Sequence, residues 1–235
     1  MKAPRQDLSP SSRIIGITGG IGMGKTTVSN HLAQVYHVPV YDADIYAREA
    51  VELGNPILDE IADRYGSGVL HPDGSLNRHR LGDIIFNCLA ERLWLEQRIH
   101  PYVRDRLLTA IRHTPIDMGH QSVIVLVVPL LFEARMTDLV TDIWVIYCSE
   151  EQQLQRLQQR DHLTLEQAKA RVSSQMAVDK KIACADVVLD NSADVEHLLQ
   201  QVDQAMYRIQ QSQRMAPARA SSHSVHNGKA LRPLS

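Results

Sequence analysis

The feature that most constrains this chain is a glycine-rich run at residues 19–26, Gly-Gly-Ile-Gly-Met-Gly-Lys-Thr, which matches the pattern G-x-x-x-x-G-K-[ST]. It follows the apolar residues 13–18 and precedes residues 27–33, whose composition suits a helix. A strand, a glycine loop and a helix in this order form a cradle for nucleotide phosphates. Glycines let backbone N–H groups approach phosphate oxygens, and the helix N-terminus favours negative charge. The plainer alternative is a glycine-rich turn that carries a solvated lysine.

Two side chains at the end of this loop suit phosphoryl transfer. Lys25 can reach the β- and γ-phosphates of a nucleotide as a point charge, and the hydroxyl of Thr26 can bind the Mg²⁺ ion that bridges them. The sequence therefore predicts a site for a magnesium nucleotide at this loop.

Strand and helix patterns alternate along the rest of the chain, which predicts a doubly wound parallel α/β sheet of five strands flanked by helices. The run at residues 122–128 is continuously apolar and β-branched, so it is predicted to be buried on both faces near the centre of the sheet. Strands are expected at residues 13–18, 38–41, 122–128, 142–148 and 186–189. Helices are expected at residues 25–36, 45–53, 56–65, 78–88, 91–112 and 192–211, and within a helical segment at 150–181.

The block at residues 45–120 is predicted to be a helical insertion between two strands. Pro101 is expected to kink or restart the helix at residues 91–112, because proline removes a backbone donor and clashes with the preceding turn. Thr164 and Gln167 are predicted to form a capping box that opens the second half of the segment at 150–181.

The charge balance excludes a strong overall attraction to nucleic acid or anionic membrane, since 25 basic residues face 27 acidic ones. The first twelve residues, a flexible N-terminal tail, are polar and contain two prolines, so they resemble neither a signal peptide nor an anchor. The longest apolar run, residues 123–132, is too short to span a bilayer. We therefore predict a cytoplasmic protein with no membrane partner and no nucleic acid expected, and the sequence indicates no particular oligomeric state.

Two further observations concern the cysteines and the carboxyl end. Cys88, Cys148 and Cys184 lie far apart in apolar surroundings without metal-ligand spacing, so they are predicted to be reduced core residues. Residues 213–235 contain four basic and no acidic side chains and lack apolar periodicity. They are predicted to form a disordered basic tail, for which a solubilising role is favoured over a nucleic-acid contact.

Asp42 and Asp44 follow the expected strand at residues 38–41. In an open parallel sheet, ligands bind at the carboxyl ends of the strands, so both carboxylates are candidates for the site. Either could instead cap the helix that follows. For Asp42 the two interpretations are equally supported by the residues.

Several basic residues could meet phosphate. Arg156 and Arg160 lie four residues apart on one helix face, although a solvated, salt-bridged helix is the interpretation that the residues alone favour. Arg48, Arg78 and His100 lie in the inserted block, where a second substrate would bind. Taken singly, each is more often a surface residue or, beside Pro101, part of a helix kink.

In combination, these motifs resemble the dephospho-CoA kinase family over about residues 14–211. The matching stretches are I-x-G-I-T-G-G-I-G-x-G-K from Ile14, D-A-D-x-x-A-R from Asp42, D-G-x-L-x-R from Asp73, H-P at His100, V-P-L-L-F-E from Val128, E-x-Q-x-x-R from Glu151 and A-D-x-V-x-D-N from Ala185.

The resemblance implies ATP-dependent phosphorylation of the ribose 3′-hydroxyl of dephospho-CoA, which completes coenzyme A. It also implies a P-loop kinase fold over residues 13–212, with a core at 13–44 and 121–212, a helical acceptor-binding insertion at about 45–120 and a mobile lid at about 150–181. Asp44 would be the base, and Arg156 and Arg160 the cations of the lid. Arg48, Arg78 and His100 would lie toward dephospho-CoA. The residues that would hold the phosphates of ATP are Gly22, Met23, Gly24, Lys25, Thr26 and Thr27.

The metal site keeps one ambiguity. Many P-loop ATPases place an aspartate at the end of the buried strand, but here the run at residues 122–128 is followed by Pro129. The Mg²⁺ ion then needs another carboxylate, and Asp42 or Asp44 is the candidate. The sequence leaves the base and metal roles undivided between them.

Two other functions remain as alternatives. A P-loop kinase of another small acceptor, such as a nucleoside monophosphate, would use the same loop and lid. A nucleotide-dependent switch would belong to a different class, but a guanine-specific one would want an N-K-x-D-like segment, which the chain lacks.

Overall fold

The structure is a computed structural model that describes residues 13–115 and 123–215. The predicted N-terminal tail at residues 1–12 and residues 216–235 of the predicted C-terminal tail lie outside the described residues. The elements in chain order are β1 (Arg13–Thr18), α1 (Lys25–Val35), β2 (Val40–Asp42), α2 (Ala43–Glu49), α3 (Pro56–Tyr65), η1 (Ser67–Val69), α4 (Arg78–Asn87), α5 (Leu89–His113), β3 (Val123–Val127), η2 (Thr137–Leu139), β4 (Asp142–Tyr147), α6 (Glu150–Asp161), α7 (Leu165–Ser173), α8 (Val178–Ile182), β5 (Val187–Asp190) and α9 (Val195–Met215).

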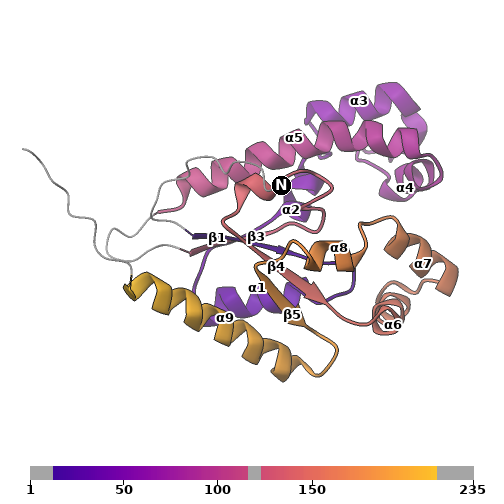
Figure 1. The fold of residues 1–235 in the computed structure, drawn as a ribbon. Coiled ribbons are helices and arrows are strands. Elements are labelled where there is room, and N and C mark those ends of the chain that lie inside the picture. Colours follow the sequence, from indigo (N-terminus) through magenta and orange to yellow (C-terminus); the bar gives the residue numbers. More distant parts are fainter. Residues whose placement is uncertain (1–12, 116–122, 216–235) are drawn as a thin grey trace, which may run out of the picture.

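The five strands form one parallel sheet in the order β2-β3-β1-β4-β5 (Figure 1). The predicted five-stranded parallel sheet is therefore confirmed, and β3 lies near its centre as predicted, beside the central strand β1. The interior strand β3 is buried from Ile124 onward. Because all strands run the same way, the segments that follow them meet at one edge of the sheet, where ligands of such folds bind.

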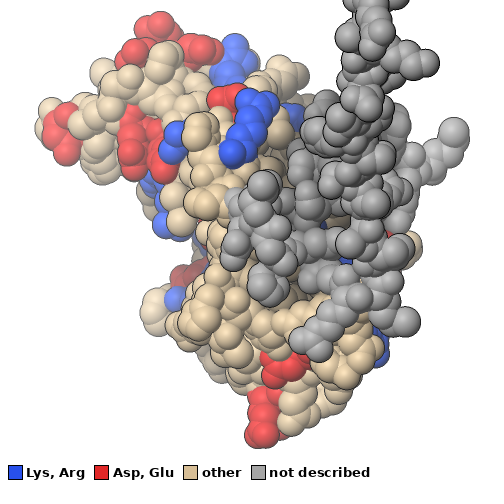
Figure 2. Space-filling view, turned by 90° about the vertical axis from the view of Figure 1, so that its left-hand side faces the viewer, with Lys and Arg blue, Asp and Glu red and all other residues tan. Residues whose placement is uncertain are grey.

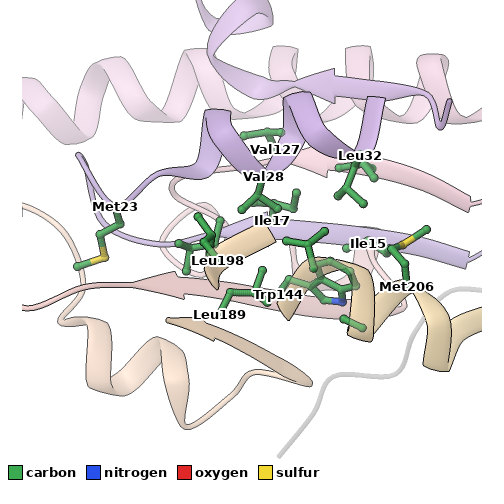
Figure 3. Close-up of a cluster of buried hydrophobic side chains, with 14 of the residues drawn as sticks. Ile15, Ile17, Met23, Val28, Leu32, Val127, Trp144, Leu189, Leu198 and Met206 are labelled. Carbon is green, nitrogen blue, oxygen red and sulfur yellow. The ribbon is translucent and has the colours of Figure 1, made fainter. Parts of the chain in front are cut away.

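Helices cover both faces of the sheet (Figure 1). On one face, α1 and α9 enclose the apolar cluster drawn in Figure 3, which includes the fully buried Trp144 of β4. On the other face, α5 contributes Val103 and Leu107 to a second cluster against β3 and β4. Burying apolar surface on both faces fixes the sheet and hence the position of its carboxyl edge.

The inserted block between β2 and β3 has a core of its own. Leu58 and Ile61 of α3 pack with Leu81 of α4 and Leu95 of α5. This separate cluster holds the insertion as a helical unit above the sheet edge (Figure 1).

Several local predictions need correction. The helix after the second strand begins at Ala43 and ends at Glu49, earlier than the predicted 45–53. Of the two outcomes predicted for Pro101, the restart does not occur, because α5 continues through it as one helix, and the kink stays a prediction. The last helix runs to Met215, so the predicted tail cannot begin at residue 213.

The cysteine prediction is wrong in two of three positions. Cys148 is buried after β4, but Cys88 and Cys184 are exposed. Cys88 lies between α4 and α5, and Cys184 lies between α8 and β5, so both occupy connections at the surface rather than element interiors.

Charged side chains of both signs occur on the visible part of the face in Figure 2, in keeping with the balanced composition. Among the described residues, the structure contains no helix with the length and apolar character needed to cross a membrane.

Candidate active site

The loop between β1 and α1 has the conformation that its glycines predict. Gly19 has φ 144° and Gly24 has φ 98°, values in the left-handed half of backbone space that side chains disfavour. Space is also short, because a Cβ on Gly19 would lie 2.3 Å from the carbonyl oxygen of Ile146, and one on Gly24 would lie 2.3 Å from Nδ2 of Asn191. The same Asn191 amide donates to the carbonyl of Met23 at 2.9 Å. The loop is thus packed against β4 and against Asn191, which follows β5.

Met23 occupies the core instead of the phosphate side of this loop. Its side chain is 2% exposed and belongs to the cluster in Figure 3. Its sulfur accepts the N–H of Gly20 at 3.1 Å. Of the predicted phosphate-binding residues, Met23 can therefore offer only its backbone.

Lys25 lies across the loop at the start of α1. Its Nζ donates to the carbonyl oxygens of Gly19 at 3.0 Å and Gly20 at 2.9 Å. The pKa of this ammonium group is lowered to about 8, mainly by burial. The carboxylate of Asp44 partly offsets this effect, and the charge of nearby Lys181 adds to it. The charged form of Lys25 is therefore disfavoured here until anionic groups bind beside it.

Asp42 and Asp44 sit at the junction of β2 and α2. A carboxylate oxygen of Asp42 accepts the backbone N–H of Asp44 at 2.8 Å, so Asp42 does cap α2. Asp44 is exposed as a residue, but its carboxyl is partly enclosed by the site. This loss of water and the charge of Asp42 raise its pKa, while Lys25 and Arg48 lower it.

A cleft of about 1020 Å³ joins these groups. It contains the predicted Mg²⁺ ligand Thr26 and both aspartates, and the lid lies on its other side. Neither Met23 nor Thr27 lines it, although Thr27 belongs to the first turn of α1. The predicted site residues that line the cleft are Gly22, Gly24, Lys25, Thr26, Asp42, Asp44, Arg48, Arg156 and Arg160.

The two lid arginines project from α6, which starts with the capping box of Ser149 and Gln152. One guanidinium N–H of Arg156 donates to the backbone oxygen of Asn191 at 3.0 Å. Arg160 donates to both carboxylate oxygens of Asp161, at 2.8 and 2.9 Å, and this pairing raises its pKa. Both arginines reach the cleft, and both already have partners.

A second, more apolar pocket of about 410 Å³ lies under the insertion. It shares Asp44, Pro129, Leu130 and Gln175 with the phosphate cleft, so the two cavities meet at the proposed base. The predicted substrate residue His100 lines it, and burial lowers the pKa of this imidazole. The pocket therefore offers an apolar surface and a mainly neutral histidine next to the phosphate site.

Arg78 lies away from both cavities. It donates to the backbone oxygen of Arg48 at 3.3 Å and lines a third cleft, of about 880 Å³, between α4 and the lid. The structure thus separates Arg78 from the other predicted site residues and links it to Arg48 through the backbone.

A buried lysine and its partly buried partner were not predicted from the sequence. Lys181 of α8 has a fully buried side chain and pairs with Glu133 at 3.0 Å. It also donates to the backbone oxygen of Pro129 at 3.0 Å, and the same oxygen accepts a hydrogen bond from the hydroxyl of Thr18. This pair fixes the turn after β3 that lines both cavities. The motif V-P-L-L-F-E contains Glu133, but nothing in the sequence pairs it with a lysine 48 residues further on.

A family model described as dephospho-CoA kinase matches residues 13–197. The chain belongs to the dephospho-CoA kinase family. A protein of Trichormus variabilis with that name is 61% identical over 196 residues, which cover 83% of this chain and 97% of the relative. A dephospho-CoA kinase of Synechocystis sp. is 47% identical over 198 residues, which cover 84% and 96%.

Solved structures give the same result for the fold. A dephospho-CoA kinase from Campylobacter jejuni matches with a TM-score of 0.63 at 26% identity, covering 85% of this chain and 98% of that one. A crystal structure from Thermus thermophilus matches with a TM-score of 0.68 at 28% identity, covering 84% and 98%. The predicted P-loop kinase fold is therefore confirmed, and the family predicted from the motifs is the one to which this chain belongs.

Proposed function

We propose that this chain transfers the γ-phosphoryl group of ATP to the ribose 3′-hydroxyl of dephospho-CoA, giving coenzyme A and ADP. The observation that carries the proposal is the junction of two cavities at Asp44. One holds the phosphate loop and Lys25, and the other is apolar and lies under the insertion. A donor and an acceptor bound in these cavities would meet at a carboxylate.

The loop holds the phosphates of ATP. Its backbone from Gly22 to Thr27 lies at the N-terminus of α1, where the helix dipole favours an anion. Within this range, the N–H groups of Met23 and Thr27 already donate to the carbonyl oxygens of Gly20 and Gly24. Lys25 exchanges its two carbonyl partners for β- and γ-phosphate oxygens. The incoming negative charge then restores the stability of its ammonium form.

Asp44 receives the proton of the acceptor. As the oxygen of the 3′-hydroxyl forms its bond to the γ-phosphorus, the bond from that phosphorus to the β,γ-bridging oxygen breaks, and the hydroxyl proton passes to the carboxylate. ADP leaves with the electrons of the broken bond. The raised pKa of Asp44 suits a group that must accept a proton.

The donor set of the cleft fits Mg²⁺. This ion prefers oxygen ligands and usually binds through one or two carboxylates together with substrate phosphates. The hydroxyl of Thr26 and the carboxylates of Asp42 and Asp44 line one cleft and are the candidate ligands. The described part of the chain contains no cluster of three or more His, Cys, Asp or Glu side chains that could hold a metal ion. When bound with ATP, the ion would neutralise phosphate charge. Asp42 already caps α2, so its second carboxylate oxygen is the one left for a metal-bound water.

The remaining predicted residues divide between the two substrates. Arg156 and Arg160 close with the lid on the transferring phosphoryl group. Arg48 and His100 face the acceptor, and Arg78 supports Arg48 from outside the cavities. The reaction takes place in the cytoplasm.

Acceptor choice tests this function. The purified chain is given ATP and Mg²⁺ with dephospho-CoA, AMP, CMP or shikimate, and ADP release is followed in each case. We expect turnover with dephospho-CoA alone, and ³¹P NMR of the product should show a new 3′-phosphomonoester. Preferred turnover with a nucleoside monophosphate would support the alternative, a P-loop kinase of another small acceptor, which the names of the relatives do not favour.

A further inference from the structure

One residue of the phosphate loop is built into the lid. Ile21 packs with the small apolar cluster of the lid, which is separate from the main core. Leu157 of α6 and Ala168 of α7 are fully buried in this cluster, and Val172 of α7 lies at its margin. Ile21 therefore supplies apolar surface to the lid, although it belongs to the loop after β1.

The backbone of Ile21 is also bonded to the lid on both sides. Its N–H donates to Oε1 of Gln175, between α7 and α8, at 2.9 Å. Its carbonyl accepts from Nε2 of Gln153, on α6, at 2.8 Å. Gln153 is only 3% exposed, so its amide is committed to this contact.

The neighbouring glycines show how closely the loop lies against α6. A Cβ on Gly22 would lie 3.4 Å from Cγ of Leu157, and one on Gly20 would lie 2.7 Å from the side-chain nitrogen of Gln153. The tip of the loop and α6 therefore cannot shift far independently.

We propose that Ile21 is a positioning residue that couples the lid to the phosphate-binding loop. The inference rests on the proposed function and adds to it how two parts of the site are kept in register. Arg156 and Arg160 lie on the same helix as Gln153 and Leu157. When α6 moves toward the phosphates, Ile21 transmits the movement to the loop, so that loop amides and lid guanidinium groups reach the phosphoryl group together.

The test compares Ile21→Ala with Val172→Ala. Both remove apolar volume from the lid cluster, but only the first removes the side-chain packing between the loop and the lid. The two backbone hydrogen bonds of Ile21 remain in both variants. Ile21→Val serves as the conservative rescue. We expect Ile21→Ala to lower kcat about tenfold or more, because small errors in position are costly in transfer reactions, while KM for ATP changes less. Val172→Ala and Ile21→Val should keep kcat near the wild-type value.

Hydrogen exchange gives a readout that does not depend on turnover. None of the residues that line the phosphate cleft belongs to α7. ADP should nevertheless slow amide exchange in α7 of the wild type and of Val172→Ala, and this protection should be lost or strongly reduced in Ile21→Ala. If Ile21→Ala does not fold, Gln175→Met removes the acceptor of the Ile21 N–H and is tested in its place.

The outcomes separate the coupling from the proposed function. Failure of the wild type to phosphorylate dephospho-CoA would contradict the proposed function, and the exchange experiment would still decide the coupling. Equal kcat and equal α7 protection in Ile21→Ala and Val172→Ala would overturn the coupling in an active kinase.

Discussion

The phosphate loop and the lid hold their cations in different ways. Lys25 is anchored by two backbone carbonyls of a loop that has no room for side chains at Gly19 or Gly24. Arg160 is bonded to its sequence neighbour Asp161, and its side chain is 59% exposed. The loop is thus preorganised, whereas in the proposed mechanism Arg160 exchanges Asp161 for the phosphoryl group when substrate binds. We expect loss of the Lys25 ammonium group to lower activity more than loss of either arginine of α6.

The largest effect is expected for Lys25→Ala. Loss of a preorganised charge at the transferring phosphoryl group should lower kcat/KM by about 10³-fold or more. The lysine contributes little to packing, so the melting temperature should stay close to that of the wild type. Near-normal turnover in a folded Lys25→Ala variant would remove the basis for the phosphate-loop assignment.

The ion pair of the buried Lys181 with Glu133 should affect stability. Lys181→Met leaves the Glu133 carboxylate without its cation. Removing one partner of a fully buried ion pair typically costs about 3–5 kcal/mol of unfolding free energy, and the loss here should be smaller because the Glu133 side chain is 22% exposed. Urea denaturation of the single variant and of Lys181→Met/Glu133→Gln measures the effect. The double variant should regain much of the loss, since its neutral amide can still accept the Met176 N–H that Glu133 accepts at 2.9 Å. Equal losses in both variants would show that the cost is not that of an unpaired charge.

The sequence predicted the parts of this molecule that depend on local pattern. The glycine loop, the five strands and the carboxyl-edge position of Asp42 and Asp44 follow from periodicity and from the geometry of a parallel sheet. Contacts between distant segments were not predictable in this way. From the sequence alone, the charge of Lys181 suggests a residue at the surface. Its burial could not be predicted, because its partner Glu133 is recognisable only in the folded chain.

The positions of Met23, Cys88 and Cys184 also depend on contacts that the sequence does not show. The motif predicts that Met23 lies at the phosphates, and this stays a prediction for its backbone, but the burial of its side chain in the core was not predicted. Apolar neighbours in sequence made Cys88 and Cys184 look buried, although each lies in a connection between elements. The link from Ile21 to Gln153 and Gln175 likewise joins residues more than 130 positions apart, and no spacing rule indicates it.

The lid arginines should show smaller effects than Lys25. Arg156→Ala and Arg160→Ala are each expected to lower kcat by about tenfold or more and to weaken ATP binding less, because a closing lid adds its charges mainly in the closed complex. Steady-state kinetics together with a separate measurement of ATP affinity distinguishes the effect on kcat from the effect on ATP binding. Small and equal changes in kcat and affinity would favour a solvated helix with no role in catalysis.

The smallest effect is a proton taken up when nucleotide binds. With its pKa lowered to about 8, Lys25 is partly neutral at about pH 8.5, and phosphate charge should raise that pKa and draw a proton onto the amine. Calorimetry of ATP binding in buffers of different ionisation enthalpy should therefore detect uptake of a fraction of a proton at this pH. The uptake should fade toward pH 6.5, where Lys25 is already charged, and should be missing in Lys25→Met. Identical uptake in that variant would assign the proton to another group.

The central claim is that Asp44 accepts the proton of the acceptor hydroxyl where the two cavities meet. Single-turnover phosphorylation of dephospho-CoA by the wild type, Asp44→Asn and Asp42→Asn tests it most directly, with ATP affinity and Mg²⁺ requirement measured for each. Asp44→Asn should slow the chemical step by about 10²–10⁴-fold with ATP affinity preserved, and Asp42→Asn should slow it much less. Loss of the chemical step in Asp42→Asn alone would contradict the claim, and an Asp44→Asn defect that extra Mg²⁺ repairs would make Asp44 a metal ligand instead of the base.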